Sequence, residues 1–261
     1  MKLSPLSTST KVTFRGLVLA ASLFEVLARF AIIRVRRGKQ LSLRDRAEWL
    51  HRSCTIILRR LSMEIRVSGV PATDGLVVSN HLSHLDILLY AGAMPCVFVS
   101  KSEVRKWPMF GILASCGGTI FVERSRPQAV NDPARGIADA LGLGIPVILF
   151  PEGTSSDGGG VLAFRSAFFE PAIATKAAIR PVAIAYSVID GIEADLCYYG
   201  DITFFPHLLT VLGRKRIRGT IIFGDEIRVN DRKTAAAAAW KEVTALRERM
   251  TGVSSSVTTP A

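Results

Sequence analysis

Hydrophobic and polar positions alternate in short blocks from residue 64 onward, and this pattern predicts a regular series of strands and helices. The expected strands are 64–67, 76–79, 97–100, 119–122, 147–150, 180–187, 195–199 and 218–224. The expected helices are 84–93, 103–114, 129–143, 164–178, 205–212 and 232–250. Because strands and helices alternate along the chain, the sequence predicts an α/β fold with a mostly parallel central sheet flanked by helices.

The pattern before residue 64 is different. Residues 16–33 form an apolar stretch interrupted mainly by Glu25 and Arg29, which predicts one long apolar helix. Residues 42–61 place apolar side chains at helical spacing with arginines on the other side, which predicts a second, amphipathic helix. We therefore expect membrane-associated helices over residues 1–62 and a catalytic domain over 63–251. Residues 1–12 and the tail 252–261 are expected to be disordered.

The positive charge of the chain is concentrated in this N-terminal part. The whole chain of 261 residues has a formal net charge of +11, and residues 1–60 hold 13 of its 33 Lys and Arg with only three acidic residues. Basic clusters beside an apolar helix attract anionic lipid head groups. A nucleic-acid binder is also basic, but this charge lies beside an apolar helix and no nucleic-acid-binding motif is present. We therefore expect anionic membrane lipids as partners, and no nucleic acid.

The relation of residues 16–33 to the membrane is left open by the sequence. Eighteen helical residues extend about 27 Å, just short of a typical hydrocarbon core. A single membrane span, a helix lying in one leaflet and a soluble core helix all fit this length. Dense positive charge follows the helix, which favours a cytoplasmic location for the rest of the chain. The four cysteines form no C-x-x-C pair and fit reduced thiols in that compartment. We therefore expect a single-pass or monotopic protein at the cytoplasmic face of the inner membrane.

Candidate chemistry lies where four predicted strands end. Asn80-His81 and Asp86 follow the strand at 76–79, Lys101 follows the strand at 97–100, and Arg124 follows the strand at 119–122. Glu152-Gly153-Thr154 follows the strand at 147–150. Functional side chains of open α/β sheets gather beyond the carboxyl ends of strands. A histidine titrates near neutral pH and a nearby carboxylate fixes its tautomer, so His81 and Asp86 form a candidate base and its orienting group.

Several other enzyme classes lack their sequence signatures here. The chain contains no G-x-S-x-G, so a serine hydrolase is not indicated. It contains neither a Walker A motif nor G-x-G-x-x-G, so nucleotide binding is not indicated. The spacing of its four histidines does not indicate a metal site.

The order of these motifs resembles the glycerophospholipid acyltransferase family, typified by bacterial 1-acyl-glycerol-3-phosphate acyltransferase. That family carries N-H-x-x-x-x-D, G-x-x-F-x-x-R, P-E-G-T and an apolar segment with a central proline. The matching segments here are 80–86, 118–124, 151–154 and 179–183, within a resemblance that covers about residues 60–225.

The resemblance implies transfer of a fatty acyl group from acyl carrier protein or acyl-CoA to the hydroxyl of a lysolipid, with no cofactor and no metal. His81 would be the general base and Asp86 its orienting carboxylate. Lys101, Arg124 and the Glu152-Gly153-Thr154 segment would hold the acceptor. A non-catalytic membrane lipid-binding protein is the alternative from another class.

One position departs from the family pattern. The family often has arginine directly after E-G-T, where it helps to bind phosphate, and this chain has Ser155. Arg165 or Lys101 could substitute for it. The segments 164–166, 199–201 and 206–208 resemble the lyso-ornithine lipid acyltransferase branch, whose acceptor has no phosphate. The sequence favours 1-acyl-sn-glycerol-3-phosphate as the acceptor, with lyso-ornithine lipid as the alternative.

Overall fold

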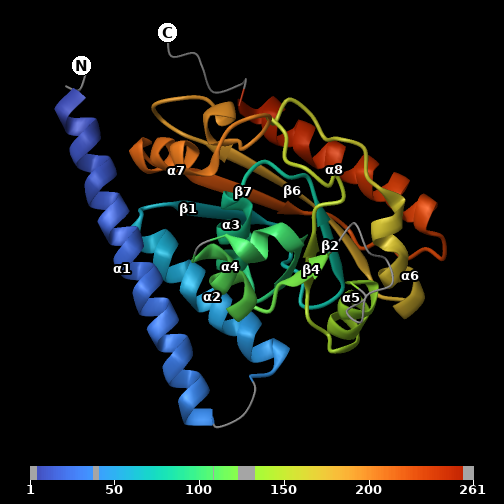
Figure 1. Cartoon of the computed structure of the whole chain (residues 1–261). Coiled ribbons are helices and arrows are strands. Elements are labelled where there is room, and N and C mark those ends of the chain that lie inside the picture. Colours follow the sequence, from blue (N-terminus) through green and yellow to red (C-terminus); the bar gives the residue numbers. More distant parts are fainter. Residues whose placement is uncertain (1–4, 38–40, 108, 123–132, 255–261) are drawn as a thin grey trace.

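The computed structural model describes residues 5–37, 41–107, 109–122 and 133–254. Its centre is one seven-stranded sheet with the strand order β1-β7-β6-β2-β5-β3-β4, and helices lie on both of its faces (Figure 1). The strands are β1 (Glu64–Ser68), β2 (Leu76–Ser79), β3 (Val97–Lys101), β4 (Ile120–Val122), β5 (Val147–Leu149), β6 (Ile179–Ser187) and β7 (Arg218–Phe223).

The helices between the strands are mostly short. The α-helices are α1 (Pro5–Arg37), α2 (Leu43–Arg60), α3 (Leu85–Ala93), α4 (Phe110–Cys116), α5 (Pro133–Gly142), α6 (Glu170–Thr175), α7 (Phe204–Gly213) and α8 (Arg232–Ser254). The 3-10 helices are η1 (Ser102–Lys106), η2 (Ser166–Phe169) and η3 (Glu193–Leu196). The α/β fold with a mostly parallel sheet that the sequence predicts is thus confirmed.

The sheet is parallel except at one junction. β2, β3, β4, β5 and β6 run in the same direction, whereas β7 is antiparallel to β6 and β1 is parallel to β7. Five carboxyl ends therefore meet at one edge of the sheet. This topology alone brings together His81 after β2, Glu152 after β5 and Lys101 at the end of β3.

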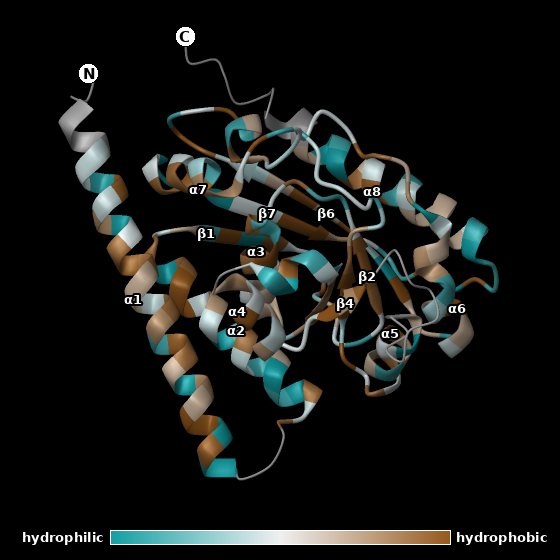
Figure 2. Ribbon diagram, viewed as in Figure 1, coloured by the Kyte–Doolittle hydropathy of each residue, from teal (hydrophilic) through white to brown (hydrophobic). Residues whose placement is uncertain are grey.

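The core has two layers because side chains of a strand alternate between the faces of a sheet. Val77 of β2 packs with α2, α3 and α7 on one face. Its neighbours Leu76 and Val78 pack with α5, α6 and α8 on the other. Strands that are covered on both faces read as continuous apolar runs, and Figure 2 shows the central strands as hydrophobic along their length.

The long first helix lies along the outside of the α/β unit. α1 contacts α2 and α7, and its side chains Leu19, Leu23, Val26 and Phe30 are buried against them. The part of α1 from Ser9 to Arg37 is long and apolar enough to cross a membrane, and no other helix in the described residues is. Figure 2 shows hydrophobic residues along most of its length.

The structure corrects five sequence expectations. α1 starts at Pro5, so residues 5–12 are helical rather than disordered, and α8 continues to Ser254, four residues beyond the expected end at residue 250. The expected helix 103–114 is two shorter helices, and so is the expected helix 164–178. The expected strand 195–199 is part of the 3-10 helix η3 and the loop after it. Residues 255–261 lie outside the described part of the chain.

Candidate active site

A histidine and an aspartate face each other directly after β2. His81 Nδ1 lies 2.7 Å from Asp86 Oδ2, and Asp86 is fully buried whereas the His81 side chain keeps 22% of its surface exposed. Because the carboxylate accepts the Nδ1 proton, the unprotonated nitrogen of the neutral ring is Nε2. Within the described residues, Nε2 has no hydrogen-bond partner. The pair that the sequence singled out is therefore assembled with one ring nitrogen available for proton transfer.

Asp86 also organises the backbone of its own loop. Asp86 Oδ2 accepts hydrogen bonds from the backbone N–H groups of Leu82, at 2.9 Å, and Ser83, at 3.2 Å. Asp86 lies in the first turn of α3, where unpaired N–H groups favour a carboxylate. One oxygen thus fixes both the histidine ring and the turn that carries it.

The other oxygen of Asp86 has a partner that sequence reasoning missed. Tyr186, a buried residue of β6, donates its hydroxyl hydrogen bond to Asp86 Oδ1. Burial, together with the negative charge of Asp86, raises the pKa of Tyr186 well above its usual value, so the phenol stays a donor. The two residues are a hundred positions apart, and no local pattern in the sequence connects them.

The position and face of the His81 ring are set by its neighbours. The ring stacks on Phe150 with a centroid distance of 4.1 Å and an interplanar angle of 17°. The preceding Asn80 is buried and exchanges two hydrogen bonds with the backbone of Ile184 in β6, at 2.9 and 3.0 Å. These contacts fix the position and the orientation of the imidazole ring.

Glu152 lies beside this pair, but its carboxylate is directed into the protein. It is 3% exposed, and its two oxygens accept the backbone N–H groups of Leu162 at 3.2 Å and His81 at 3.4 Å. Burial raises the pKa of Glu152 to about 8, so the carboxyl adds little negative charge near His81 at neutral pH. This geometry favours a role in holding the loop around His81 over the direct acceptor contact that the sequence suggested.

The next three residues form the rim of the site. Gly153 has a φ of 74°, a left-handed conformation that glycine adopts without strain, and Thr154 is exposed. Ser155 turns inward and donates its hydroxyl to the backbone oxygen of Tyr198. The position at which the family pattern often has arginine therefore carries a small side chain that bonds to the protein itself.

Of the two basic candidates, Lys101 and Arg124, only Lys101 lies within the described residues. Lys101 is exposed at the end of β3, two strands away from β2 at the same edge of the sheet. Arg124 follows β4 but lies outside the described residues, so its acceptor-binding role stays a prediction. The alternative cation, Arg165, is exposed, and its backbone N–H bonds to Pro151 O at 3.1 Å, which places it in the loop after Glu152.

An aromatic cluster borders the catalytic loop on the α7 side. His84 packs against Tyr198, Phe204 and His207, with centroid distances of 5.7, 4.9 and 5.0 Å. Burial lowers the pKa of His84 to about 3 and also lowers that of His207, so both rings are neutral at working pH. Within the described ranges, no three His, Cys, Asp or Glu side chains are grouped as metal ligands.

A buried ion pair, also missed by sequence reasoning, lies behind Tyr186. Arg247 of α8, with 4% of its side chain exposed, pairs with Glu193, whose Oε1 accepts an Arg247 hydrogen bond at 3.0 Å. Glu193 Oε1 also accepts the backbone N–H of Tyr186 at 2.6 Å, and Arg247 donates to Gly158 O at 3.0 Å. The pair therefore joins α8, β6 and the loop after Glu152.

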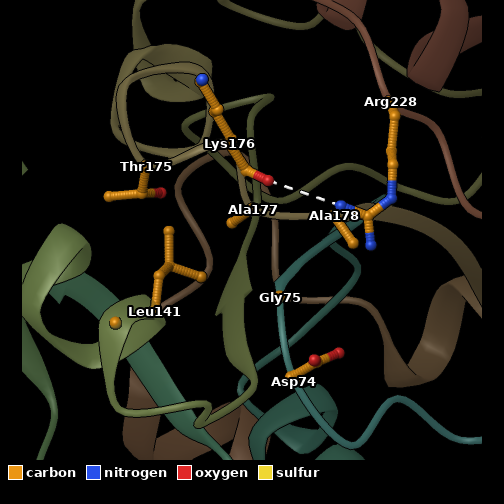
Figure 3. Close-up of a pocket in the computed structure, with 9 residues that line it drawn as sticks. Asp74, Gly75, Leu141, Thr175, Lys176, Ala177, Ala178 and Arg228 are labelled. Atoms are coloured by element: carbon orange, nitrogen blue, oxygen red, sulfur yellow. Dashed lines mark hydrogen bonds between the residues drawn. The ribbon is translucent and has the colours of Figure 1, made fainter.

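A separate hollow of about 180 Å³ lies at the opposite edge of the sheet (Figure 3). Asp74 and Gly75, which line it, precede β2, whereas His81 follows β2. On its other side Arg228 donates to the backbone oxygen of Lys176 at 3.5 Å. The hollow contains none of the motif residues, so it is distinct from the site around His81.

The arrangement around His81 can take a proton from a hydroxyl. An oriented imidazole with a buried carboxylate behind it is a general base, and the carboxylate stabilises the imidazolium that forms. Within the described residues, no serine or cysteine side chain bonds to the His81 ring; the Ser156 hydroxyl donates to the His81 backbone oxygen instead, at 3.5 Å. A direct attack of the deprotonated hydroxyl on an electrophile therefore fits this geometry better than a covalent enzyme intermediate.

Comparisons with known proteins agree with this chemistry. The acyltransferase family model matches residues 64–185. A lyso-ornithine lipid O-acyltransferase of Brucella abortus is 33% identical over 248 residues, which cover 88% of this chain and 90% of that protein. A 1-acyl-sn-glycerol-3-phosphate acyltransferase of Neisseria meningitidis serogroup B is 30% identical over 198 residues and covers 74% of each chain.

A solved structure has the same fold. The crystal structure of the 1-acyl-sn-glycerophosphate acyltransferase PlsC from Thermotoga maritima aligns with a TM-score of 0.64 and 18% identity, covering 92% of this chain and 98% of that one. At this identity, the likeness concerns the fold.

Proposed function

Because the chain belongs to the acyltransferase family, we propose that it transfers a fatty acyl group from a thioester to the free hydroxyl of a lysolipid. The observation that carries the mechanism is the His81–Asp86 pair with an available Nε2 at the carboxyl edge of the sheet. The donor is an acyl carrier protein or coenzyme A thioester, and the reaction needs no further cofactor. A non-catalytic lipid-binding protein would not require this oriented pair.

The proposed reaction has two steps. His81 Nε2 takes the proton of the acceptor hydroxyl while the oxygen attacks the thioester carbonyl carbon, which gives a tetrahedral intermediate. The carbon–sulfur bond then breaks, and the imidazolium returns the proton to the leaving thiolate. Asp86 stays ionised throughout, orients the ring through Nδ1 and stabilises the imidazolium between the two steps.

We propose lyso-ornithine lipid as the acceptor. Its head group is an amino acid without phosphate, and Ser155 places no positive charge where the family pattern often has a phosphate-binding arginine. The Ser155 hydroxyl donates its proton to the backbone oxygen of Tyr198, so this proton is not available to an acceptor head group. The relative in Brucella abortus, which covers most of this chain, carries the same acceptor in its name. The second candidate acceptor is 1-acyl-sn-glycerol-3-phosphate, the acceptor named for the Neisseria relative.

An acceptor panel tests this assignment. We expect the purified enzyme, with a radiolabelled thioester, to acylate lyso-ornithine lipid with a higher kcat/KM than 1-acyl-sn-glycerol-3-phosphate. Ser155→Arg should shift the ratio of the two kcat/KM values towards the phosphate acceptor at least tenfold, because one charge-assisted bond to phosphate contributes about 1.5–3 kcal/mol. Ser155→Gln, which has length without charge, is the matched control. A wild-type preference for the phosphate acceptor would overturn the assignment.

The contacts of α1 favour a helix that lies in the plane of the membrane. Lys11 donates to Gly213 O at 3.3 Å near one end of α1, and Arg37 pairs with Asp45 near the other. The helix between Lys11 and Arg37 extends about 39 Å, which exceeds the hydrocarbon core of a bilayer at about 30 Å. A helix that contacts its own domain over this length cannot cross the bilayer unless the domain is inside it. We therefore propose a monotopic enzyme at the cytoplasmic face.

The opposite side of α1 suits contact with lipid. Five large apolar side chains on it are exposed and share one helical stripe: Phe14, Leu17, Phe24, Ile32 and Val35. This stripe lies across the helix from the buried Leu23 and Val26. The basic residues at the end of α1 complement anionic head groups.

Phe24→Asp should weaken binding to vesicles that contain anionic lipid at least tenfold, because burial of a large apolar side chain contributes about 1.5–3 kcal/mol. Co-sedimentation of the purified protein with vesicles measures this binding. The matched control is Leu143→Asp, at an exposed position after α5 that is not part of the apolar stripe of α1. Equal vesicle binding of Phe24→Asp and wild type would contradict an in-plane α1.

A further inference from the structure

The carboxylate of Asp86 has a different set of partners on each of its oxygens. Oδ2 accepts from His81 and from two backbone N–H groups. Oδ1 accepts from the Tyr186 hydroxyl. Hydrogen bonds thus link three side chains in series, His81, Asp86 and Tyr186, from the reacting edge into the core of the sheet.

Tyr186 is held rigidly at the end of this series. It lies in β6, where it pairs with Gly219 of β7, and it is only 6% exposed. Its backbone N–H donates to Glu193 at 2.6 Å, and Glu193 is itself paired with the buried Arg247. A phenol fixed in this way presents its O–H to Asp86 in one direction.

We propose that Tyr186 is a positioning residue of the acyl transfer: by bonding Asp86 Oδ1, it sets the carboxylate plane and the negative charge that Asp86 presents to His81. It does not touch the reacting atoms and acts only through Asp86. A carboxylate that donates part of its charge to a phenol leaves less negative charge on the oxygen that faces the imidazole. The hydroxyl therefore moderates the stabilisation that Asp86 gives to the imidazolium, and its removal should strengthen that stabilisation.

Other charged or titratable groups lie near His81, Asp86 and Tyr186 as well. Glu152, after β5, lies near Asp86 and bonds to the His81 backbone. His84, at the start of α3, lies near His81 and is neutral because burial lowers its pKa to about 3. The substitution below changes none of these groups, so a change in the pH profile reports on the hydroxyl.

The test is Tyr186→Phe in the full-length enzyme. We expect kcat to fall about tenfold, as for the loss of one bond to a charged group, with both KM values within about twofold. We also expect the acidic limb of the pH profile of kcat/KM to move to higher pH by about half a unit to one unit. A structural role alone would lower stability without moving this limb.

The matched control is Tyr90→Phe. Tyr90 is also buried and donates its hydroxyl at 2.6 Å, but its acceptor is Ser79 Oγ instead of Asp86. We expect a comparable loss of thermal stability and an unchanged acidic limb. An unmoved limb in Tyr186→Phe, or an equal movement in Tyr90→Phe, would overturn the proposal.

A second measurement keeps the test independent of folding. Site-specific 3-fluorotyrosine at position 186 retains the shape and is a stronger donor, so the acidic limb should move to lower pH. A shift to higher pH, or none, would argue against the proposal.

The inference rests on the proposed acyl transfer, but the two can fail separately. Absence of lysolipid-dependent acyl transfer by the wild-type enzyme refutes the function, whereas an unmoved limb in an active Tyr186→Phe enzyme refutes only the role of Tyr186.

Discussion

Replacement of His81 by alanine should lower kcat for lysolipid acylation by about 10²–10⁴-fold, the usual loss when a general base is removed. The physical reason is that the hydroxyl of a lysolipid is a poor nucleophile until its proton is accepted. His81 provides the acceptor nitrogen next to a buried carboxylate. The measurement is release of free thiol from the thioester that depends on added lysolipid.

The matched control for this variant is His51→Ala. His51 lies on α2, is half-buried and bonds through Nδ1 to the backbone oxygen of Ala91 at 2.7 Å, so it has no path to the reacting edge. We expect kcat close to that of wild type for the control and a native circular dichroism spectrum for both variants. Transfer at the wild-type rate by purified His81→Ala would contradict the mechanism.

The largest loss of stability is expected for Arg247→Met. The substitution leaves the Glu193 carboxylate partly buried without its cation, and such an uncompensated charge costs about 3–5 kcal/mol. It also removes the hydrogen bond to Gly158 O, so the loop after Glu152 loses a contact. For a domain of this size, the expected fall in Tm is about 6–20 °C. Thermal unfolding of the detergent-solubilised enzyme measures it.

Two further variants sharpen this test. Arg249→Met removes an exposed ion pair with Glu242 from the same helix, at 3.3 Å, and should cost less than about 1 kcal/mol. The double variant Glu193→Leu, Arg247→Met removes both charges and should recover part of the lost Tm. If the double variant is less stable than Arg247→Met alone, the buried charge is not the cause of the loss.

Where the sequence carried a local signal, the strands were predictable. The apolar runs that form β2 and β5 are covered on both faces of the sheet, and this burial is what makes such a run continuous. The strand order and the reversal at β7 could not be derived in the same way. The strand order and the direction of β7 depend on which surfaces pack together, and no short segment of the sequence carries a signal for that packing.

The wrong expectations have identifiable causes. The helix expected over 103–114 is interrupted at Trp107, whose ψ of 128° is the extended conformation favoured before proline, and by Met109 with a φ of 61°. The helix expected over 164–178 is divided near Pro171, which lies in the first turn of α6. The strand expected over 195–199 is apolar because it packs on the catalytic loop, where the Tyr198 N–H bonds to Leu82 O at 2.7 Å.

The candidate site shows the same division between local and distant information. His81 and Asp86 are five residues apart, so their contact followed from one motif and one strand end. Tyr186 and Glu193 lie about a hundred residues further along the chain and carry no motif. Arg247 did leave a signal, because it follows Val243 by four residues and therefore lies on the buried face of α8. A charged residue on an apolar helix face indicates a buried partner.

The way α1 is attached has a consequence for engineering a soluble form of this enzyme. Arg15 bonds to backbone oxygens of Leu61 and Arg214, at 2.6 Å each, so α1 closes the ends of both α2 and α7. Phe204 of α7 in turn packs on His84 in the catalytic loop. Truncation before residue 41 would therefore expose apolar surface and release a support of the site. Solubility is better sought by replacing the outer stripe of α1 with polar residues while its inner face is retained.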